Sequence, residues 1–146
     1  ELNLILFGGE KYSKYDAELI ERYNLENKKI KFISGNNLLL QSYYMNAKLF
    51  VYPSLYEGFG LPILEAMANS CPVCCSRTTS IPEVAGVAAE YFDPRKPEEI
   101  AKKMEKVIFN KRISKKLISR GLIQSKKFSW KKCAKETIEV YKKIII

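Results

Sequence analysis

The feature of this sequence that most constrains its fold is the alternation of short apolar runs with segments of helical length. Each apolar run ends at a glycine, a proline or a polar turn. Short strands that are apolar throughout are typical of a parallel sheet covered on both faces, and the intervening segments can serve as crossover helices. The sequence therefore predicts an α/β protein with a Rossmann-like parallel sheet and helices on both faces. The expected strands cover residues 2–7, 30–33, 49–52, 72–75 and 89–92.

Segments with the apolar spacing of amphipathic helices separate these runs and continue after the last one. Helices are expected at 15–23 and 38–47, from residue 61 onward, and at 98–109, 113–125 and 130–144. No internal repeat, low-complexity tract or linker interrupts the pattern. We therefore expect a single domain over residues 1–146, with a helical C-terminal end.

The composition narrows the possible chemistry. The 146 residues are 47% hydrophobic and include no histidine. A folded domain is expected, while His-based triads and imidazole general bases are excluded. No apolar run approaches the ~20 residues that a membrane-spanning helix needs. The chain begins with Glu followed at once by an apolar run, so we expect it to be part of a longer polypeptide.

The four cysteines indicate structural rather than metal-binding roles. Cys71 and Cys74 have CxxC spacing, but no second such pair and no histidine completes a zinc site. Cys74 and Cys75 belong to an expected buried strand, where cysteine behaves as a small apolar residue. Reduced structural cysteines are typical of cytoplasmic proteins, which is the location that we expect.

Charge is distributed unevenly along the chain. Residues 1–101 contain 10 Lys and Arg against 13 Asp and Glu, whereas residues 102–146 contain 15 against 3. A basic block of this kind can bind anionic lipid or nucleic acid. Charged helix faces in contact with water explain the same block, and we favour that interpretation because a charge block alone is weak evidence.

Three turns follow the carboxyl ends of expected strands. They contain Gly8 and Gly9, Ser34 and Gly35, and residues 53–60. Ligands of open α/β sheets bind outside these strand ends, so the three turns are expected to line one crevice. The first turn lacks the GxGxxG pattern of dinucleotide-binding proteins, which argues against a nicotinamide cofactor.

The third turn has the composition of a loop that approaches a ligand. Gly58 and Gly60 allow close approach of the backbone and conformations closed to other residues. Leu61 and Pro62 then begin a helix, whose first amides favour an anionic oxygen. A strand–turn–helix connection without any ligand would have the same residues, so the pattern alone leaves both interpretations open.

Glu57 and Glu65 flank this turn, Glu57 in the loop and Glu65 one turn into the helix. A carboxylate at the rim can accept two hydrogen bonds from a vicinal diol such as a ribose. Glu57 would then face the other end of the same ligand, which fits a nucleotide-sugar. The alternative is that both carboxylates simply face water.

The stretch from Glu57 to Glu65, EGFGLPILE, resembles the E-x7-E motif of retaining GT-B glycosyltransferases of family 4, also called group 1. Other segments resemble the family's further landmarks over nearly the whole chain. They are Pro53-Ser54, the EAMA of residues 65–68, Pro72-Val73, the SIPEV of residues 80–84, the FDP of 92–94 and the FSW of 128–130.

The resemblance implies roles for individual residues. Glu57 would face the donor sugar as the catalytic residue, and Glu65 would hold the ribose hydroxyls. The remaining donor-binding positions would be the backbone of Gly58, Phe59, Gly60 and Leu61 at the sugar and diphosphate, Gly9 at the phosphates, and Ser34 with Gly35 near the base. The family mechanism needs no bound metal, so no cofactor is expected besides the nucleotide-sugar co-substrate.

The implied reaction is transfer of a sugar from a UDP- or GDP-type donor with retention at the anomeric carbon. In the family, an N-terminal acceptor domain and a further strand and helix with an Arg and a Lys precede the segment seen here. The fragment is therefore expected to be inactive alone. A polysaccharide or lipid-linked acceptor at the inner face of a membrane fits such a transferase.

The alternative function is a non-catalytic Rossmann-like module that binds anionic lipid or nucleic acid through its basic C-terminal helices. Nucleic acid is the less favoured of these partners.

Two local expectations concern helix ends. Ser80 and Glu83 have the spacing of a capping box, in which the serine caps the following helix. Ser70 stands where the family usually has glycine, and Asn69 is expected to adopt the left-handed conformation in its place.

Overall fold

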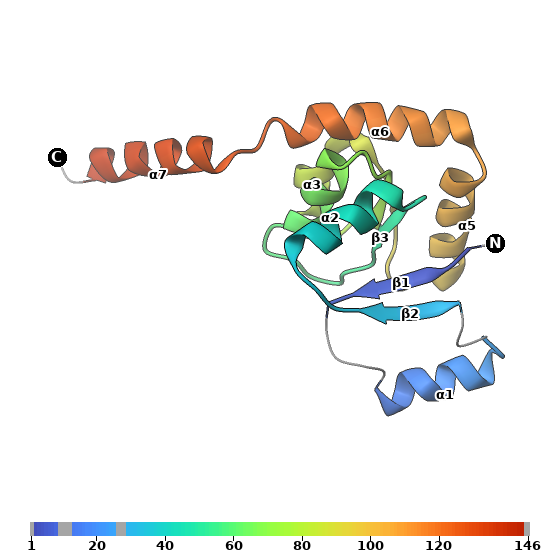
Figure 1. The fold of residues 1–146 in the computed structure, drawn as a ribbon. Coiled ribbons are helices and arrows are strands. Elements are labelled where there is room, and N and C mark those ends of the chain that lie inside the picture. The colour runs from blue at the N-terminus through green and yellow to red at the C-terminus, as the bar shows by residue number, and fades with distance from the viewer. Residues whose placement is uncertain (1, 9–12, 26–28, 145–146) are drawn as a thin grey trace. The chain divides into compact units, whose positions relative to one another are not determined.

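In the computed structural model, which describes residues 2–8, 13–25 and 29–144, strands and helices alternate along the chain as the sequence predicts (Figure 1). The chain divides into two packing units, Glu1–Leu40 and Gln41–Ile146. The elements are β1 (Leu4–Phe7), α1 (Lys14–Arg22), β2 (Ile30–Ile33), α2 (Asn37–Asn46), β3 (Phe50–Tyr52), α3 (Leu61–Ala68), β4 (Val73–Ser76), α4 (Ile81–Ala85), the 3-10 helix η1 (Gly86–Ala88), β5 (Ala89–Phe92), α5 (Pro97–Ile108), α6 (Lys111–Ser125) and α7 (Trp130–Ile144).

The unit of residues 1–40 contains a parallel strand pair. β1 pairs with β2 from Leu4 opposite Ile30 to Phe7 opposite Ile33. Parallel neighbours need a crossover connection, and α1 provides it. A capping box starts this helix: the Ser13 hydroxyl accepts from the Asp16 amide at 3.1 Å, and the Asp16 carboxylate accepts from the Ser13 amide at 2.9 Å.

The unit of residues 41–146 contains a three-stranded parallel sheet in the order β3-β4-β5. Phe50 lies opposite Val73, and Val73 lies opposite Ala89. The predicted α/β class with parallel strands is therefore confirmed, and the strands belong to two sheets, one in each unit. Each observed strand in this unit lies within one or two residues of its predicted bounds.

Part of the core of this unit lies between the sheet and helices α5 and α6, and helices α3 and α4 contribute further buried residues. Cys74, Phe92, Val107 and Leu117 form a buried cluster. Cys71, Cys74 and Cys75 are all buried, and burial raises the pKa of the Cys71 and Cys74 thiols to about 12. Such thiols are protonated and unreactive at neutral pH. The interpretation of Cys74 and Cys75 as small apolar strand residues is thus confirmed.

Helix α3 is held by close packing against α6. Gly121 of α6 faces Met67 of α3, and a Cβ atom added at Gly121 would lie 3.0 Å from Met67 Cγ. Glycine at this position lets the two helices approach within a distance that a larger residue would prevent. This contact fixes the C-terminal turn of α3 against α6.

The end of α3 differs in detail from the expectation. Ser70, with φ of 60°, adopts the left-handed conformation, whereas Asn69 has φ of −96°. The Asn69 side chain instead donates to the Glu65 carbonyl oxygen at 2.9 Å, which keeps this residue in the last turn of the helix. The prediction for Asn69 was therefore wrong by one position.

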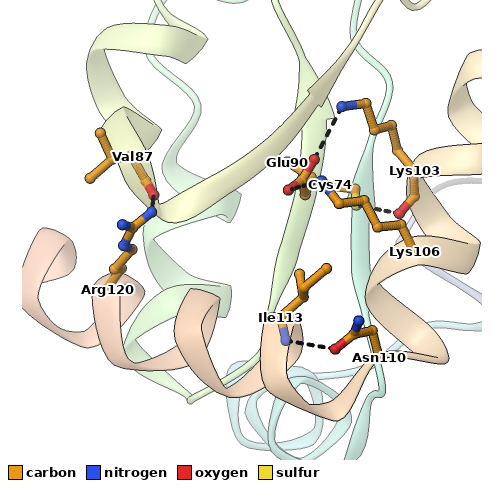
Figure 2. A network of polar contacts seen from close by, with 8 residues as sticks. All are labelled: Cys74, Val87, Glu90, Lys103, Lys106, Asn110, Ile113 and Arg120. Atoms are coloured by element: carbon orange, nitrogen blue, oxygen red, sulfur yellow. Dashed lines mark hydrogen bonds and ion pairs between the residues drawn. The ribbon is translucent and has the colours of Figure 1, made fainter.

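A charged cluster joins β5 to α5. Glu90 lies between two lysines of α5 (Figure 2), at 3.1 Å from Lys103 Nζ and 2.8 Å from Lys106 Nζ. Partial burial raises the pKa of Glu90, but hydrogen bonds from Lys106 and Lys103 outweigh it and leave the pKa below its ordinary value. The contacts stabilise the ionised form of Glu90 in the folded protein.

We expect Glu90→Gln to lower the melting temperature at pH 7 and to have a much smaller effect at pH 3. Because the folded pKa of Glu90 is lowered, its contribution is present above the unfolded pKa, about 4.3, and is lost as the pH falls through the folded pKa. The expected loss at pH 7 is about 1 kcal/mol, since the cluster is partly exposed. Circular dichroism melts at both pH values measure it.

The matched control is Glu105→Gln, because Glu105 is an exposed carboxylate of α5, the helix that carries Lys103 and Lys106. An equal loss of stability at pH 7 and pH 3 in Glu90→Gln would contradict the assignment of its effect to the ion pairs.

Candidate functional site

The loop of residues 53–60 connects β3 to α3 and ends in a backbone conformation that requires glycine. Gly60 has φ of 100° and precedes the first residue of α3, and no side chain caps this helix. Pro62 occupies the first turn, where its missing N–H costs nothing. An added Cβ atom at Gly58 would meet nothing within 4 Å, so the loop is open at this point. The uncapped start of α3 can therefore receive an anionic group.

The Glu57 carboxylate is held by two hydroxyl groups. Tyr52 Oη lies 2.6 Å and Ser54 Oγ 2.8 Å from the same oxygen, Glu57 Oε1. A carboxylate only accepts hydrogen bonds, so both hydroxyl groups donate. Within the part of the chain that the structure describes, no hydrogen bond reaches the other oxygen, Oε2. That oxygen is left to accept a donor from elsewhere.

Further hydroxyl groups hold the main chain of the same loop. Ser76 Oγ and Thr78 Oγ1 donate to the Ser54 carbonyl oxygen at 2.6 and 3.1 Å, and the Glu57 amide donates to Thr79 Oγ1 at 3.1 Å. We call Tyr52, Ser54, Ser76, Thr78, Thr79 and Ser80 the hydroxyl cradle. The cradle connects the loop to the end of β4 and the segment that follows it.

Ser80 belongs to this cradle and does not cap α4. Its hydroxyl lies 2.9 Å from the Glu57 carbonyl oxygen and 3.2 Å from that of Phe59. The residue has φ of −78° and ψ of −14° and makes no capping hydrogen bond. The predicted capping box with Glu83 is therefore wrong. The Ser80 hydroxyl contacts the carbonyl oxygens of Glu57 and Phe59, and this contact replaces the capping hydrogen bond.

Glu65 lies on the exposed side of α3, in its second turn. The hydroxyl of the buried residue Tyr44 lies 3.5 Å from Glu65 Oε2. Each glutamate that flanks the loop is thus approached by a tyrosine hydroxyl from the underlying fold. Burial, and then the charge of Glu65, raise the pKa of Tyr44, so the hydroxyl keeps its proton.

The two tyrosines belong to one row of aromatic rings. The Tyr44 ring packs edge-on against Phe50, with centroids 5.3 Å apart, and Phe50 stacks on Tyr52 at 5.7 Å. Burial, followed by the hydrogen bond to Glu57, also raises the pKa of Tyr52. Both hydroxyl groups are therefore protonated donors at neutral pH, fixed by rings whose positions depend on one another.

Phe59 and Leu61 border the loop on its exposed side. Phe59 is 42% and Leu61 43% exposed. The Phe59 ring packs edge-on against Phe128, with centroids 5.7 Å apart. Apolar side chains at this degree of exposure can cover a bound sugar or base.

The residues predicted to lie near the base and the phosphates do not belong to the unit that contains Glu57 and Glu65. Ser34 and Gly35 follow β2, as expected, and belong to the unit of residues 1–40. Gly9 lies outside the described residues. Glu57 to Glu65 belong to the other unit, so the expected meeting of all three turns at one crevice stays a prediction.

The described residues offer neither a metal site nor a membrane-spanning helix. Among them, no cluster of three or more Cys, Asp or Glu could hold a metal ion. No helix in the same ranges is both long and apolar enough to cross a membrane.

Sequence reasoning identified the glutamates and the glycines but not the residues that hold them. Tyr44 and Tyr52 were assigned only to a helix and a strand. The available signal was the concentration of hydroxyl residues at 76–80 together with Ser54, two segments that a parallel pairing of β3 and β4 brings to the same sheet edge.

Comparison with solved structures places this arrangement in a known class. The chain matches HepE from Anabaena, solved in complex with UDP-glucose, with a TM-score of 0.81 and 25% identity over 97% of this chain and 41% of that one. The parallel α/β fold is that of the GT-B glycosyltransferases. A family model described as glycosyl transferases group 1 matches residues 1–124, so the chain belongs to that family.

Two relatives from Escherichia coli are similar in sequence. An O-antigen chain mannosyltransferase B is 46% identical over 99 residues, which are 68% of this chain and 26% of the relative. A serotype-specific mannosyltransferase, WbdA, is 37% identical over 130 residues, 87% of this chain and 16% of the relative. The chain thus spans about a quarter or less of the length of these relatives.

We expect Ser80→Ala to loosen the loop without unfolding the core. Loss of the hydroxyl removes the donor that the Glu57 and Phe59 carbonyl groups share. Amide hydrogen exchange at Glu57, whose N–H donates to Thr79 Oγ1, should accelerate by about fivefold, the effect of one hydrogen bond of about 1 kcal/mol.

Ser119→Ala is the matched control, because that hydroxyl donates within α6 to the Lys115 carbonyl oxygen. If Ser80→Ala left exchange in the loop unchanged, or accelerated exchange equally in β4, the hydroxyl would not have the local role assigned to it.

Proposed function

We propose that residues 1–146 form the donor-binding domain of a retaining glycosyltransferase that takes its sugar from a nucleoside diphosphate sugar. The observation that carries this proposal is the pair Glu57 and Glu65 on either side of an uncapped helix start, in a chain of the group 1 family. The acceptor-binding domain would belong to another part of the same polypeptide. The fragment alone would be inactive.

The proposed ligand extends along the loop. The free oxygen of Glu57 accepts a hydroxyl of the donor sugar, and the amides at the start of α3 meet the diphosphate. Glu65 accepts the two hydroxyl groups of the ribose from its exposed position on α3. Supporting this order, the spacing of the two glutamates matches a ligand with hydroxyl groups at both ends and charge in the middle.

In the proposed reaction, the bond between the anomeric carbon and the diphosphate oxygen breaks while a bond to the acceptor oxygen forms on the same face. The nucleoside diphosphate leaves with the bonding electrons, and the acceptor's proton passes to it. The positive end of the α3 dipole stabilises the developing charge. We propose no resident metal. Glu57 positions the donor sugar.

We propose mannose as the donor sugar, because the two relatives from Escherichia coli are named mannosyltransferases. The O-antigen chain in one of those names also supports a polysaccharide acceptor. A lipid-linked acceptor at the inner face of a membrane is compatible with the basic charge of residues 102–146. A cytoplasmic protein associated with such a membrane surface would meet both its donor and its acceptor.

The direct test is the affinity of the chain for GDP-mannose, UDP-glucose, GDP and UDP, measured by ligand-observed NMR. We expect a nucleoside diphosphate sugar to bind more tightly than its own nucleoside diphosphate. Glu57→Gln should remove the advantage conferred by the sugar, and Glu65→Ala should weaken both ligands by about tenfold, because a ribose loses a charged hydrogen-bond acceptor.

Glu105→Gln, at an exposed position of α5, should leave all affinities unchanged. If the wild-type chain binds none of these ligands, or if both site variants bind like the wild type, the proposed function is wrong.

A further inference from the structure

The Glu57 side chain has two donors on one oxygen, and none of the residues that the structure describes donates to the other. Tyr52 Oη and Ser54 Oγ approach Oε1 at 2.6 and 2.8 Å. Hydrogen bonds to a charged acceptor are the stronger kind, and two of them from different directions restrict both the position and the rotation of the carboxylate. The orientation of Oε2 is therefore set before any ligand arrives.

The donors are themselves fixed by the fold. Tyr52 is the last residue of β3 and stacks on Phe50, while β3 pairs with the fully buried strand β4. Ser54 is held through its carbonyl oxygen by Ser76 and Thr78. The tyrosine hydroxyl stays protonated, because burial and the hydrogen bond to Glu57 raise its pKa. Tyr52 thus links the sheet to the Glu57 side chain in the open loop.

We propose that Tyr52 is a positioning residue that orients the Glu57 carboxylate toward the donor sugar, with Ser54 as its second support. The inference rests on the proposed function, since it assigns the free oxygen of Glu57 to a sugar hydroxyl. Preorganisation of this kind avoids the entropy cost of ordering a flexible glutamate on binding. Tyr52 does not touch the ligand, and its effect passes through Glu57 alone.

The first readout needs no ligand. Three-bond couplings of the Glu57 side chain, measured by NMR, should show one dominant rotamer in the wild-type chain. In Tyr52→Phe the ring and its stacking on Phe50 remain, and the couplings should become those of averaged rotamers. An averaged Glu57 in the wild type, or an unchanged Glu57 in Tyr52→Phe, would overturn the inference whatever the chain binds.

The second readout separates positioning from a merely structural effect. In Tyr52→Phe, the ratio of the affinity for the nucleoside diphosphate sugar to that for the nucleoside diphosphate should fall by about tenfold, the effect of one hydrogen bond to a charged group. The affinity for the nucleoside diphosphate itself should stay unchanged. A structural defect in the loop would weaken both ligands together, and that result would contradict the inference.

A double-mutant cycle tests whether Tyr52 acts through Glu57. Once Glu57→Gln has removed the sugar's advantage, adding Tyr52→Phe should cause no further change in the ratio. The matched control is Tyr91→Phe, because Tyr91 also ends in a half-buried hydroxyl but donates to the Gly86 carbonyl oxygen at 2.6 Å. Equal effects of Tyr52→Phe with and without Glu57 would show that Tyr52 acts by another route.

The outcomes distinguish the two proposals. If the wild type binds no nucleotide but Glu57 shows one rotamer that Tyr52→Phe averages, the proposed function fails while the positioning role of Tyr52 holds. If Glu57→Gln loses the sugar's advantage and Tyr52→Phe keeps it, the donor site holds and the inference about Tyr52 fails.

Discussion

The structure of the candidate site depends on two hydrogen bonds, which the hydroxyl groups of Tyr52 and Ser54 donate to the Glu57 carboxylate. A glutamate in an open loop would sample several rotamers, and each would point its charge in a different direction. Tyr52 and Ser54 remove that freedom through contacts of 2.6 and 2.8 Å. The entropy cost of ordering the side chain is thereby met on folding and would not weaken the proposed binding of a ligand.

The sheet and helices beneath the loop make this arrangement rigid. β4 is buried along its whole length and is paired on both sides, so the hydroxyl groups at and beyond its end have fixed positions. The ring row of Tyr44, Phe50 and Tyr52 connects the supports of the two glutamates. On the other side, α3 packs closely on α6 at Gly121. A flexible ligand would meet two carboxylates and a helix start whose separations are already set by the core.

Most of the fold followed from the sequence, because apolar periodicity and turn residues are local signals. β5 and α7 have the predicted bounds, and Glu57, Gly60 and Pro62 were placed correctly in a loop and helix start. The roles of Tyr44, Tyr52 and Ser80 could not be predicted in the same way. Their hydroxyl groups bond to residues 21, 5 and 23 positions away, so their partners are known only once the chain has folded.

The local rules failed where a tertiary contact competed with them. Ser80 has the spacing of a cap, but its hydroxyl is used by the loop. The most direct test of the donor site is an amide NMR titration of the chain with a nucleoside diphosphate sugar. We expect shifts at Gly58, Phe59, Gly60, Leu61 and Glu65, with none along α6. Binding without shifts at these five residues, or shifts confined to the basic helices, would contradict the proposed donor site.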